Sequence, residues 1–513
     1  MIQLIHTNNK VVAVSQNSKK LLGYEGKNCV KVLFELTKKF PDELIIWHEA
    51  SFKDAIAWNE INTVFHHKRI MASYSFAEYY LSPSIGYVED SPFLKVLKQV
   101  QFPTWQMSSD IGGVFSEVLL QIPETFWKTK DFLYLLNSIG KCLQQKGILC
   151  YSSPQLVFNK RVLSEVKNKK VTKTVLFKFV KQHYKTRWVF LLFLNLFISE
   201  KKLPLLALLN TFFIAKRKTN NIEISKIAVQ STRKTTNQTS IDVVIPTIGR
   251  SACLYDVITD LSKQTKLPEN VIIVEQTSNN LKVSELDYLT SETWPFKIIH
   301  HFIKQTGACN ARNIALKEVK SSWVFFADDD IRLNKDFLST CIDTISQFKS
   351  DAFTVSCLRK NETEAVQNVK QWSSFGSGCS IVNAKIATKI NYDLAFEYGF
   401  GEDKDYGMQL RNKGIDILYN PFAKLLHLKA PDGGFREVMI KPKNEATISP
   451  KPSQTIMLYY NRYSTLQQLK GYKLQLFIKF YRSQEIRNPL RYLSVMKKRW
   501  NLSVQLAKDL NKK

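Results

Sequence analysis

The chain has 513 residues, of which 44% are hydrophobic and 23% are charged. This composition excludes an intrinsically disordered chain, and the length exceeds what one hydrophobic core organises, so we expect two or three domains. The formal net charge is +28, from 73 Lys and Arg against 45 Asp and Glu, which indicates either an anionic partner or a solvated basic surface.

The positive charge is concentrated in residues 160–188, residues 216–234 and the tail after residue 430. That tail carries 17 Lys and Arg against 5 Asp and Glu. Nucleic acid, anionic lipid headgroups and polyanionic substrates all attract such a surface.

The eight cysteines show no metal-ligand spacing, and several lie inside apolar runs, which is typical of reduced core residues. The first ten residues lack a basic start followed by an apolar stretch, so we expect no signal peptide. Together these observations predict a cytoplasmic protein.

The first half of the chain contains two candidate strands, Glu43–Trp47 and Ser84–Asp90, and the second ends in the acids Glu89 and Asp90. A long apolar run, Trp188–Ile198, has about half the length that a membrane-spanning helix needs.

Residues 199–202 interrupt that run before a second apolar stretch, Leu203–Ile214, so the region is either a buried helix or an interfacial one. Basic residues just before the run favour the interfacial alternative: Lys178, Lys181, Lys185 and Arg187. We therefore expect a peripheral contact with an anionic membrane, at its inner face, and no span.

Residues 216–240 are polar, charged and poor in large apolar side chains, which predicts a linker. After it, apolar strand patterns alternate with helical ones, and this alternation predicts an α/β fold with a mostly parallel sheet flanked by helices. The predicted strands are 241–246, 271–275, 297–303, 323–327 and 352–357, and the predicted helices are 251–265, 308–320 and one after Asn334.

The two halves also resemble one another. The segment Lys146–Phe158 parallels Lys413–His427 with a gap of one residue, and each follows a helix-like segment. We infer a tandem of two related α/β modules, of which the first lacks the acidic motifs of the second and is degenerate. Chance similarity of short motifs is the alternative. The predicted domains are 1–215, a linker at 216–240, 241–435, and a basic helical region at 436–513.

The strongest chemical signal joins two strand ends. The strand 241–246 breaks at Pro246, and the strand 323–327 ends in three adjacent carboxylates, Asp328, Asp329 and Asp330. In open α/β sheets ligands bind at the carboxyl ends of parallel strands. Three adjacent carboxylates repel one another unless a cation such as Mg²⁺ or Mn²⁺ neutralises them, and such an ion usually carries phosphate. These strand ends predict a metal–nucleotide site.

Six segments from residue 240 to residue 430 resemble inverting family 2 glycosyltransferases of the GT-A fold. In chain order they are Val243–Thr247, Val271–Glu275, Gly307–Asn313, Asp328–Asp330, Gly401–Asp405 and Tyr419–His427. The resemblance implies transfer of a sugar from a nucleotide-diphosphate donor, a UDP-sugar above all, to a saccharide or lipid-linked saccharide, as in cell-surface polysaccharide synthesis. It also implies Mn²⁺ or Mg²⁺ as the cofactor.

The resemblance assigns roles to individual residues. The donor nucleotide would be bound by a set that contacts the base, ribose or diphosphate, namely Pro246, Thr247, Arg250, Glu275, Gly307, Arg312, Asp328 and Asp329. The family usually has Asp where this chain has Glu275, which leaves the identity of the base open. The helix that begins after Gly307 would hold the diphosphate.

The metal ligands would be Asp330 and His427. Inversion requires a carboxylate to accept the proton of the acceptor hydroxyl, and the motif position favours Asp403, with Glu402 as the alternative. Acids in the first turn of a helix are also stabilised by its dipole, which is the structural alternative for this pair.

The acceptor would meet Trp372 and Gly378, and residues 431–436 would form a lid. Two rivals remain: a non-catalytic carbohydrate- or nucleic-acid-binding protein on a transferase-like fold, and a nucleotidyltransferase. The complete set of acidic motifs disfavours the first, and the Glu402–Asp403 pair with His427 disfavours the second. We do not expect nucleic acid to be the partner.

Overall fold

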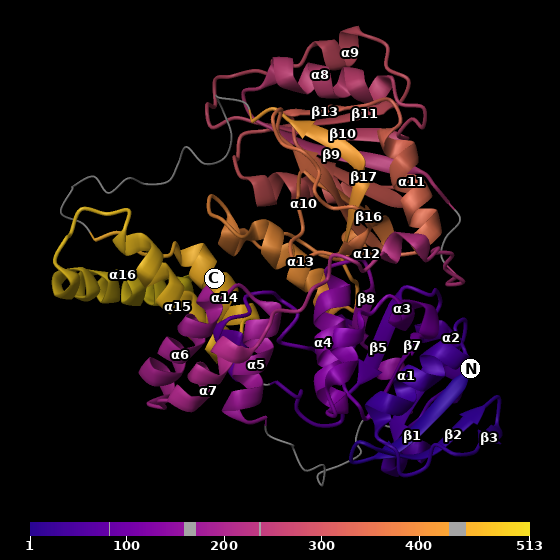
Figure 1. Ribbon diagram of the computed structural model, residues 1–513. Helices are drawn as coiled ribbons and strands as arrows, with labels where there is room; N and C mark the ends of the chain where they lie inside the picture. Colours follow the sequence, from indigo (N-terminus) through magenta and orange to yellow (C-terminus); the bar gives the residue numbers. More distant parts are fainter. Residues whose placement is uncertain (82, 159–170, 235–237, 430–447, 513) are drawn as a thin grey trace. The chain divides into compact units, whose positions relative to one another are not determined.

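The structure is a computed structural model that describes the chain apart from residues 82, 159–170, 235–237, 430–447 and 513 (Figure 1). It divides into two compact units. Unit 1 comprises Met1–Arg233 and Tyr463–Glu485, and unit 2 comprises Lys234–Arg462 and Ile486–Lys513.

Unit 1 is built on a mixed sheet with the strand order β3-β2-β1-β4-β7-β5-β8-β6. The pairs β1–β4 and β5–β8 are parallel, and the other neighbours are antiparallel. The strands are β1 (Ile2–Thr7), β2 (Lys10–Gln16), β3 (Lys19–Leu21), β4 (Leu44–Glu49), β5 (Ile70–Tyr74), β6 (Phe102–Pro103), β7 (Ile111–Phe115) and β8 (Leu149–Ser152).

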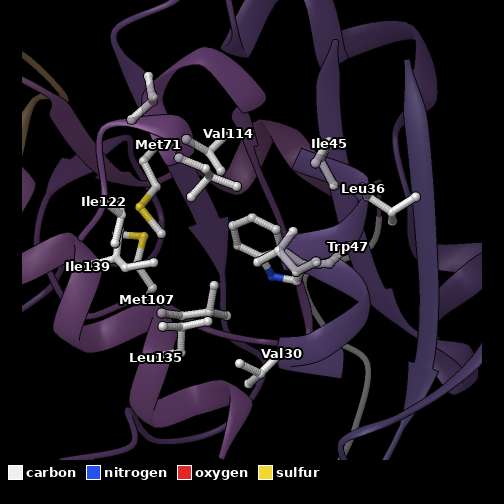
Figure 2. Close-up of a cluster of buried hydrophobic side chains, with 14 of the residues drawn as sticks. Val30, Leu36, Ile45, Trp47, Met71, Met107, Val114, Ile122, Leu135 and Ile139 are labelled. Atoms are coloured by element: carbon white, nitrogen blue, oxygen red, sulfur yellow. The ribbon is translucent and has the colours of Figure 1, made fainter. Parts of the chain in front are cut away.

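The main core of unit 1 lies between this sheet and the helices α1 (Cys29–Lys39), α3 (Ser116–Leu120) and α4 (Phe132–Gln144). Figure 2 shows Trp47 of β4 among side chains from α1 and α4, including Val30 and Leu135. Fully burying such a large apolar side chain contributes on the order of 2 kcal/mol or more, so this cluster fixes α1 and α4 to the sheet.

A second core is formed by helices α5 (Lys173–His183), α6 (Arg187–Glu200) and α7 (Leu205–Asn210) with the 3-10 helix η3 (Ser84–Tyr87). The helix α15 (Leu466–Tyr481) contacts η3 and α6. No helix in the described part of the chain is both long enough and apolar enough to cross a membrane.

Two expectations for this half are wrong. The segment Ser84–Asp90 is not a strand, because its first residues form η3 and Glu89 is buried. The carboxylate of Glu89 pairs with the ammonium of Lys141 and accepts a hydrogen bond of 2.7 Å from the Tyr184 hydroxyl. It is therefore held inside the fold and does not form a strand-end acidic site.

The predicted linker is also largely part of unit 1. Ile222, Ile224 and Ile227 are buried in its main core. The Arg69 guanidinium donates hydrogen bonds to the carbonyls of Ile227 at 2.6 Å and Ser225 at 3.1 Å, which fixes the backbone there. The predicted C-terminal region is likewise not one domain, because its described helices divide between the two units.

Unit 2 contains the sheet β11-β10-β9-β12-β16-β14-β17-β13, with β15 paired to β17. The pairs β11–β10, β10–β9, β9–β12 and β14–β17 are parallel, and the pairs that involve β13, β15 or β16 are antiparallel. Six of the nine described strands therefore share one direction, which confirms the mostly parallel sheet. The strands are β9 (Ile241–Thr247), β10 (Asn270–Gln276), β11 (Lys297–Ile303), β12 (Trp323–Ala327), β13 (Ile331–Leu333), β14 (Ala352–Leu358), β15 (Lys370–Gln371), β16 (Cys379–Asn383) and β17 (Leu418–His427).

Helices flank this sheet, so the α/β expectation holds (Figure 1). Among the helices with eight or more residues, α8 (Ser251–Ser262), α10 (Ala308–Glu318) and α11 (Phe337–Phe348) contact strands of the sheet. The other long helices assigned wholly or mainly to unit 2 are α13 (Glu402–Asn412), α14 (Gln454–Tyr463) and α16 (Pro489–Leu510). α13 is tied to the chain after the sheet by Arg462, which lies 3.2 Å from Asp405 and 2.7 Å from Asp393.

Part of the strand order is the same in both units. The run β1-β4-β7-β5-β8 has the neighbours and relative directions of β9-β12-β16-β14-β17, and in each unit a short strand, β6 or β15, pairs antiparallel with the last strand of the run. β6 pairs with Tyr151 and Ser152, and β15 pairs with Leu418 and Tyr419, so both short strands contact the segments that the predicted internal repeat aligns.

Candidate active site

The predicted site residues gather at one edge of the unit 2 sheet. β9, β10 and β12 run parallel, so their carboxyl ends lie at the same edge. The strands are buried on both faces and mainly apolar, apart from Asp242 near the start of β9, and their polar residues stand at the carboxyl ends. Thr247, Glu275 and Asp328 are brought to this edge in that way.

Asp329 is held by the loop that follows β9. The Thr247 hydroxyl donates to its carboxylate at 2.7 Å, and the Arg250 guanidinium donates at 2.9 Å. Burial raises the pKa of Asp329 to about 6, against the lowering effect of Thr247 and Arg250. Arg250 also lies 3.4 Å from Asp330, so one cation faces two of the three acids.

Asp330 and His427 lie side by side. Ile331 pairs with His427 in the β13–β17 ladder, and the His427 Nε2 is 3.4 Å from an Asp330 carboxylate oxygen. The hydrogen bond with Asp330 raises the pKa of His427 above its usual range. A carboxylate oxygen beside an imidazole nitrogen is a donor pair that suits Mn²⁺ better than Mg²⁺.

This pair could supply only part of an ion's coordination shell. Among the residues that the structure describes, no group of three His, Cys, Asp or Glu side chains is arranged to hold a metal ion. Oxygens of a bound diphosphate and water would have to complete the shell, as is usual for an ion that accompanies phosphate.

Asp328 lies between a cation and a glycine. The buried Arg312 guanidinium of α10 donates to its carboxylate at 3.0 Å. A Cβ at Gly378 would lie 2.0 Å from an Asp328 oxygen, so any larger residue here would displace that carboxylate. The structure thus brings Gly378, which the sequence assigns to the acceptor side, directly against the nucleotide-side acid Asp328.

The amino end of α10 is already capped. The Glu397 carboxylate accepts the backbone N–H of Cys309 at 3.0 Å and that of Asn310 at 2.8 Å. Gly307 precedes the helix with φ of 135°, a conformation that favours glycine. A carboxylate therefore occupies the place that the sequence assigns to the diphosphate.

The Glu275 carboxylate is also engaged by neighbouring groups. It accepts from the Ser284 hydroxyl at 2.6 Å and the Glu285 backbone N–H at 3.2 Å, and the His300 Nε2 lies at 3.0 Å. A base that binds here would have to share or displace these partners.

Asp403 and Glu402 lie in the first turn of α13, as the motif predicts. One Asp403 oxygen accepts the Ser377 backbone N–H at 3.3 Å, which joins α13 to the loop before β16. Desolvation raises the pKa of Asp403 above its ordinary value, although Arg312 opposes that rise. A raised pKa is what a carboxylate needs to accept a proton near neutral pH.

Trp372 follows β15 and stacks on Tyr419 of β17, with ring centroids 4.4 Å apart. Tyr419 thus covers one face of the indole, and the Lys370 ammonium lies over the same ring, 5.2 Å from its centroid. The Trp372 carbonyl accepts a hydrogen bond of 2.6 Å from the buried Arg411. The predicted lid at 431–436 lies outside the described residues.

Sequence reasoning missed two residues of this region. Glu397 had no signal beyond lying five residues before Glu402. Ser377 stands inside the glycine-containing segment 372–378 and could have been noticed there. Its backbone holds Asp403, and its hydroxyl accepts a hydrogen bond of 2.9 Å from Tyr392.

Comparison with known proteins shows that this region is similar to one family. Residues 242–401 match the family described as Glycosyl transferase family 2. An uncharacterized glycosyltransferase of Haemophilus influenzae is 30% identical over 90 residues, which cover 18% of this chain and 29% of that protein. The matched part therefore spans less than a third of that relative.

Solved structures resemble the chain more distantly. Residues 1–349 of S. aureus TarS, crystallised with UDP-GlcNAc, match with a TM-score of 0.35 and 15% identity over 52% of this chain and 81% of that one. GalNAc-T7, crystallised with UDP, GalNAc and Mn²⁺, matches with a TM-score of 0.34 and 11% identity over 46% of this chain and 55% of that one.

Proposed function

We propose that this protein, whose residues 242–401 form a family 2 glycosyltransferase domain, transfers a sugar from a UDP-sugar to a saccharide or lipid-linked saccharide with inversion at the anomeric carbon. The observation that carries the proposal is the set of three aspartates at the end of β12, which faces Arg250, Arg312 and His427. Carboxylates at the carboxyl end of a sheet can bind a divalent ion, and cations beside them can contact the diphosphate that the ion carries.

We propose Asp330 and His427 as the residues that hold a divalent ion. The short distance between them supports this, since an ion that replaced the proton on Nε2 would lie within reach of both side chains. Such an ion would stabilise the negative charge of the departing nucleoside diphosphate. Arg250 and Arg312 supply fixed positive charge beside the same acids and would share in that stabilisation.

We propose Asp403 as the general base. In inverting transfer the acceptor oxygen attacks the anomeric carbon as the bond to the diphosphate breaks, and the hydroxyl proton passes to a carboxylate. The raised pKa of Asp403 and the hydrogen bond that fixes it to Ser377 support this assignment over Glu402. Polysaccharide synthesis is the setting that this chemistry suits.

We further propose that unit 1 is a degenerate copy of the transferase module. The shared strand order and strand directions support a common origin. At the end of β4, the topological counterpart of β12, the chain reads Glu49-Ala50-Ser51 where unit 2 has three aspartates. Unit 1 thus has one acidic residue at this position where unit 2 has three, so we expect unit 1 to lack transfer activity.

The excess of positive charge supports a last part of the proposal, a peripheral position at the inner face of an anionic membrane.

Turnover tests the proposal directly. Each of a panel of UDP-sugars is incubated with the full chain, Mn²⁺ and candidate saccharide acceptors, and release of UDP is measured. Proton NMR of the product then reports whether the anomeric configuration is inverted. Binding of saccharide without release of UDP from any donor would favour the non-catalytic alternative.

A further inference from the structure

Helix α6 is apolar on two opposite faces, and only one of them is buried. Val189, Leu192 and Leu196 lie in the second core of unit 1. Side chains that recur at intervals of three or four residues share one face of a helix. Such a set is exposed on α6: Phe190, Leu194, Phe197 and Ile198.

The exposed apolar surface continues on the next two elements, α7 and the 3-10 helix η6 (Thr211–Phe213). Both α6 and α7 contact α5, and Figure 1 shows the three helices grouped in unit 1. Phe213 is 91% exposed and Leu206 is 79% exposed. We define the α6–α7 patch as the exposed side chains of these elements: Phe190, Leu194, Phe197, Ile198, Leu205, Leu206, Leu209, Phe212 and Phe213.

Cations flank the elements of the α6–α7 patch along the chain. From residue 185 to residue 218 the chain carries seven Lys and Arg but a single acid, Glu200. That acid is paired with Lys202 at 2.8 Å and Lys173 at 3.5 Å, so it adds little free negative charge. Exposed basic residues of this stretch are Lys185, Arg187, Lys201, Lys202, Lys216 and Lys218.

This combination matches an anionic bilayer in two respects. Large exposed apolar surfaces mark interaction sites, and phenylalanine and leucine side chains can enter the acyl region of a lipid leaflet. Lysine side chains extend their apolar stems alongside and leave their ammonium groups among lipid phosphates.

We propose that the α6–α7 patch is a lipid-binding surface that inserts into the headgroup region of an anionic bilayer. This surface would hold the protein in the peripheral membrane position proposed above. It is independent of sugar transfer, because lipid binding can be measured without donor or acceptor.

Vesicle flotation with the full chain tests the proposal. The protein should float with vesicles of phosphatidylglycerol and phosphatidylcholine at low salt, and poorly with phosphatidylcholine alone. Replacing two patch residues, Phe212→Ser with Phe213→Ser, should weaken binding at least tenfold, which corresponds to about 1.4 kcal/mol. The matched control is Leu22→Ser with Leu281→Ser, since these leucines are 79% and 93% exposed but lie outside the patch. This control should float like the unmodified protein.

The contribution of charge to vesicle binding is tested with a second variant. Lys216→Gln with Lys218→Gln should reduce flotation at low salt and leave the salt-resistant fraction unchanged, because salt screens charges but not apolar insertion. Equal binding by the Phe212/Phe213 variant and its control would overturn the proposal. So would an absence of flotation accompanied by a dimer that the Phe212/Phe213 variant converts to a monomer in sedimentation, since a second copy would then cover the patch.

Discussion

Glu397 holds the amino end of α10 by accepting the backbone N–H of Asn310 at 2.8 Å, and its other oxygen accepts the N–H of Cys309. Gly307 allows this approach, because a Cβ there would lie 2.4 Å from the Glu397 carboxyl carbon. A diphosphate at this helix end would need the same N–H groups. Donor binding at α10 therefore requires Glu397 to withdraw.

The first prediction follows from this competition. Glu397→Ala should bind UDP about fivefold more tightly, since removal of a competing charge at a helix end is worth about 1 kcal/mol. The same variant should lose about 1 kcal/mol of stability because α10 loses its cap. Isothermal titration with UDP and Mn²⁺ measures the first effect, and denaturant unfolding measures the second.

A remote cap provides the matched control for Glu397→Ala. The Asn488 side chain accepts the backbone N–H groups of Leu490 and Arg491, each at 3.0 Å, at the start of α16. Asn488→Ala should lose similar stability and keep the affinity for UDP unchanged. Weaker or unchanged UDP binding by Glu397→Ala would show that the diphosphate binds elsewhere and that Glu397 is only a cap.

The second prediction concerns the proposed metal ligands. Asp330→Ala should abolish Mn²⁺-dependent release of UDP, because the ion loses its carboxylate, and excess EDTA should abolish it in the unmodified protein. Electron paramagnetic resonance of Mn²⁺ in the presence of UDP should show a loss of bound ion in the variant. Asp336→Ala, an exposed acid just before α11, is the control. Full activity of the unmodified protein in EDTA would contradict the metal assignment.

The strand ends of unit 2 could be predicted because one physical rule governs them. β12 is the buried apolar run Trp323–Ala327, with the predicted bounds, and the three carboxylates follow directly at its carboxyl end. The segment Lys413–His427, which the internal repeat picks out, contains β17, and most side chains of β17 are buried.

Long-range contacts explain what the sequence could not predict. Ser84–Asp90 has the apolar content of a strand, but carbonyls at its end accept hydrogen bonds from a helix far along the chain. The Gln468 side-chain amide donates to the carbonyl of Glu89 at 3.1 Å and to that of Ser91 at 2.9 Å. The contact between Glu397 and Cys309 likewise joins residues 88 positions apart. Neither partner carries a local pattern that reveals the other.

The error at the predicted linker has a related cause. Residues 216–240 as a whole contain few large apolar side chains, so their average composition is that of a linker, although residues 222–227 include three isoleucines. Each isoleucine is nevertheless buried, and the Arg69 guanidinium donates hydrogen bonds to two of the backbone carbonyls in this segment. Composition averages over the segment, whereas packing depends on these individual positions.

The third prediction separates stability from catalysis in unit 1. Glu89→Ala should lower the free energy of unfolding by about 3 kcal/mol, because it leaves the ammonium of Lys141 buried without its carboxylate. Release of UDP per folded molecule should not change, since unit 1 is proposed to be inactive. Asp42→Ala, an exposed acid of the same unit, is the control. A loss of turnover that exceeds the loss of folded protein would give unit 1 a part in the reaction.

The fourth prediction gives the pH dependence of the same pair. Although burial alone would raise the pKa of Glu89, Lys141 lowers it below the ordinary glutamate value. A lowered folded-state pKa means that the stability is present above the unfolded pKa and is lost as the pH falls through the folded one. The stability difference between the unmodified protein and Glu89→Ala should therefore shrink only below about pH 4.5. Denaturant unfolding across this range measures it, and a constant difference down to pH 2 would contradict the ion-pair explanation.

The last prediction concerns the proposed base. Desolvation raises the pKa of Asp403, so the folded state disfavours its charged form at neutral pH, and this cost disappears as the pH falls through the folded pKa. Asp403→Asn should therefore keep or gain thermal stability at neutral pH, whereas its kcat should fall by about two to four powers of ten because the proton acceptor is gone. UDP affinity should stay within about twofold, since the carboxylate acts on the acceptor proton. The activity of the unmodified protein should decline on acidification at a higher pH than an ordinary aspartate would give.

Glu402→Gln is the matched comparison in the same helix turn, and it should retain most of its turnover. If Glu402→Gln is the inactive variant and Asp403→Asn is active, the base is Glu402.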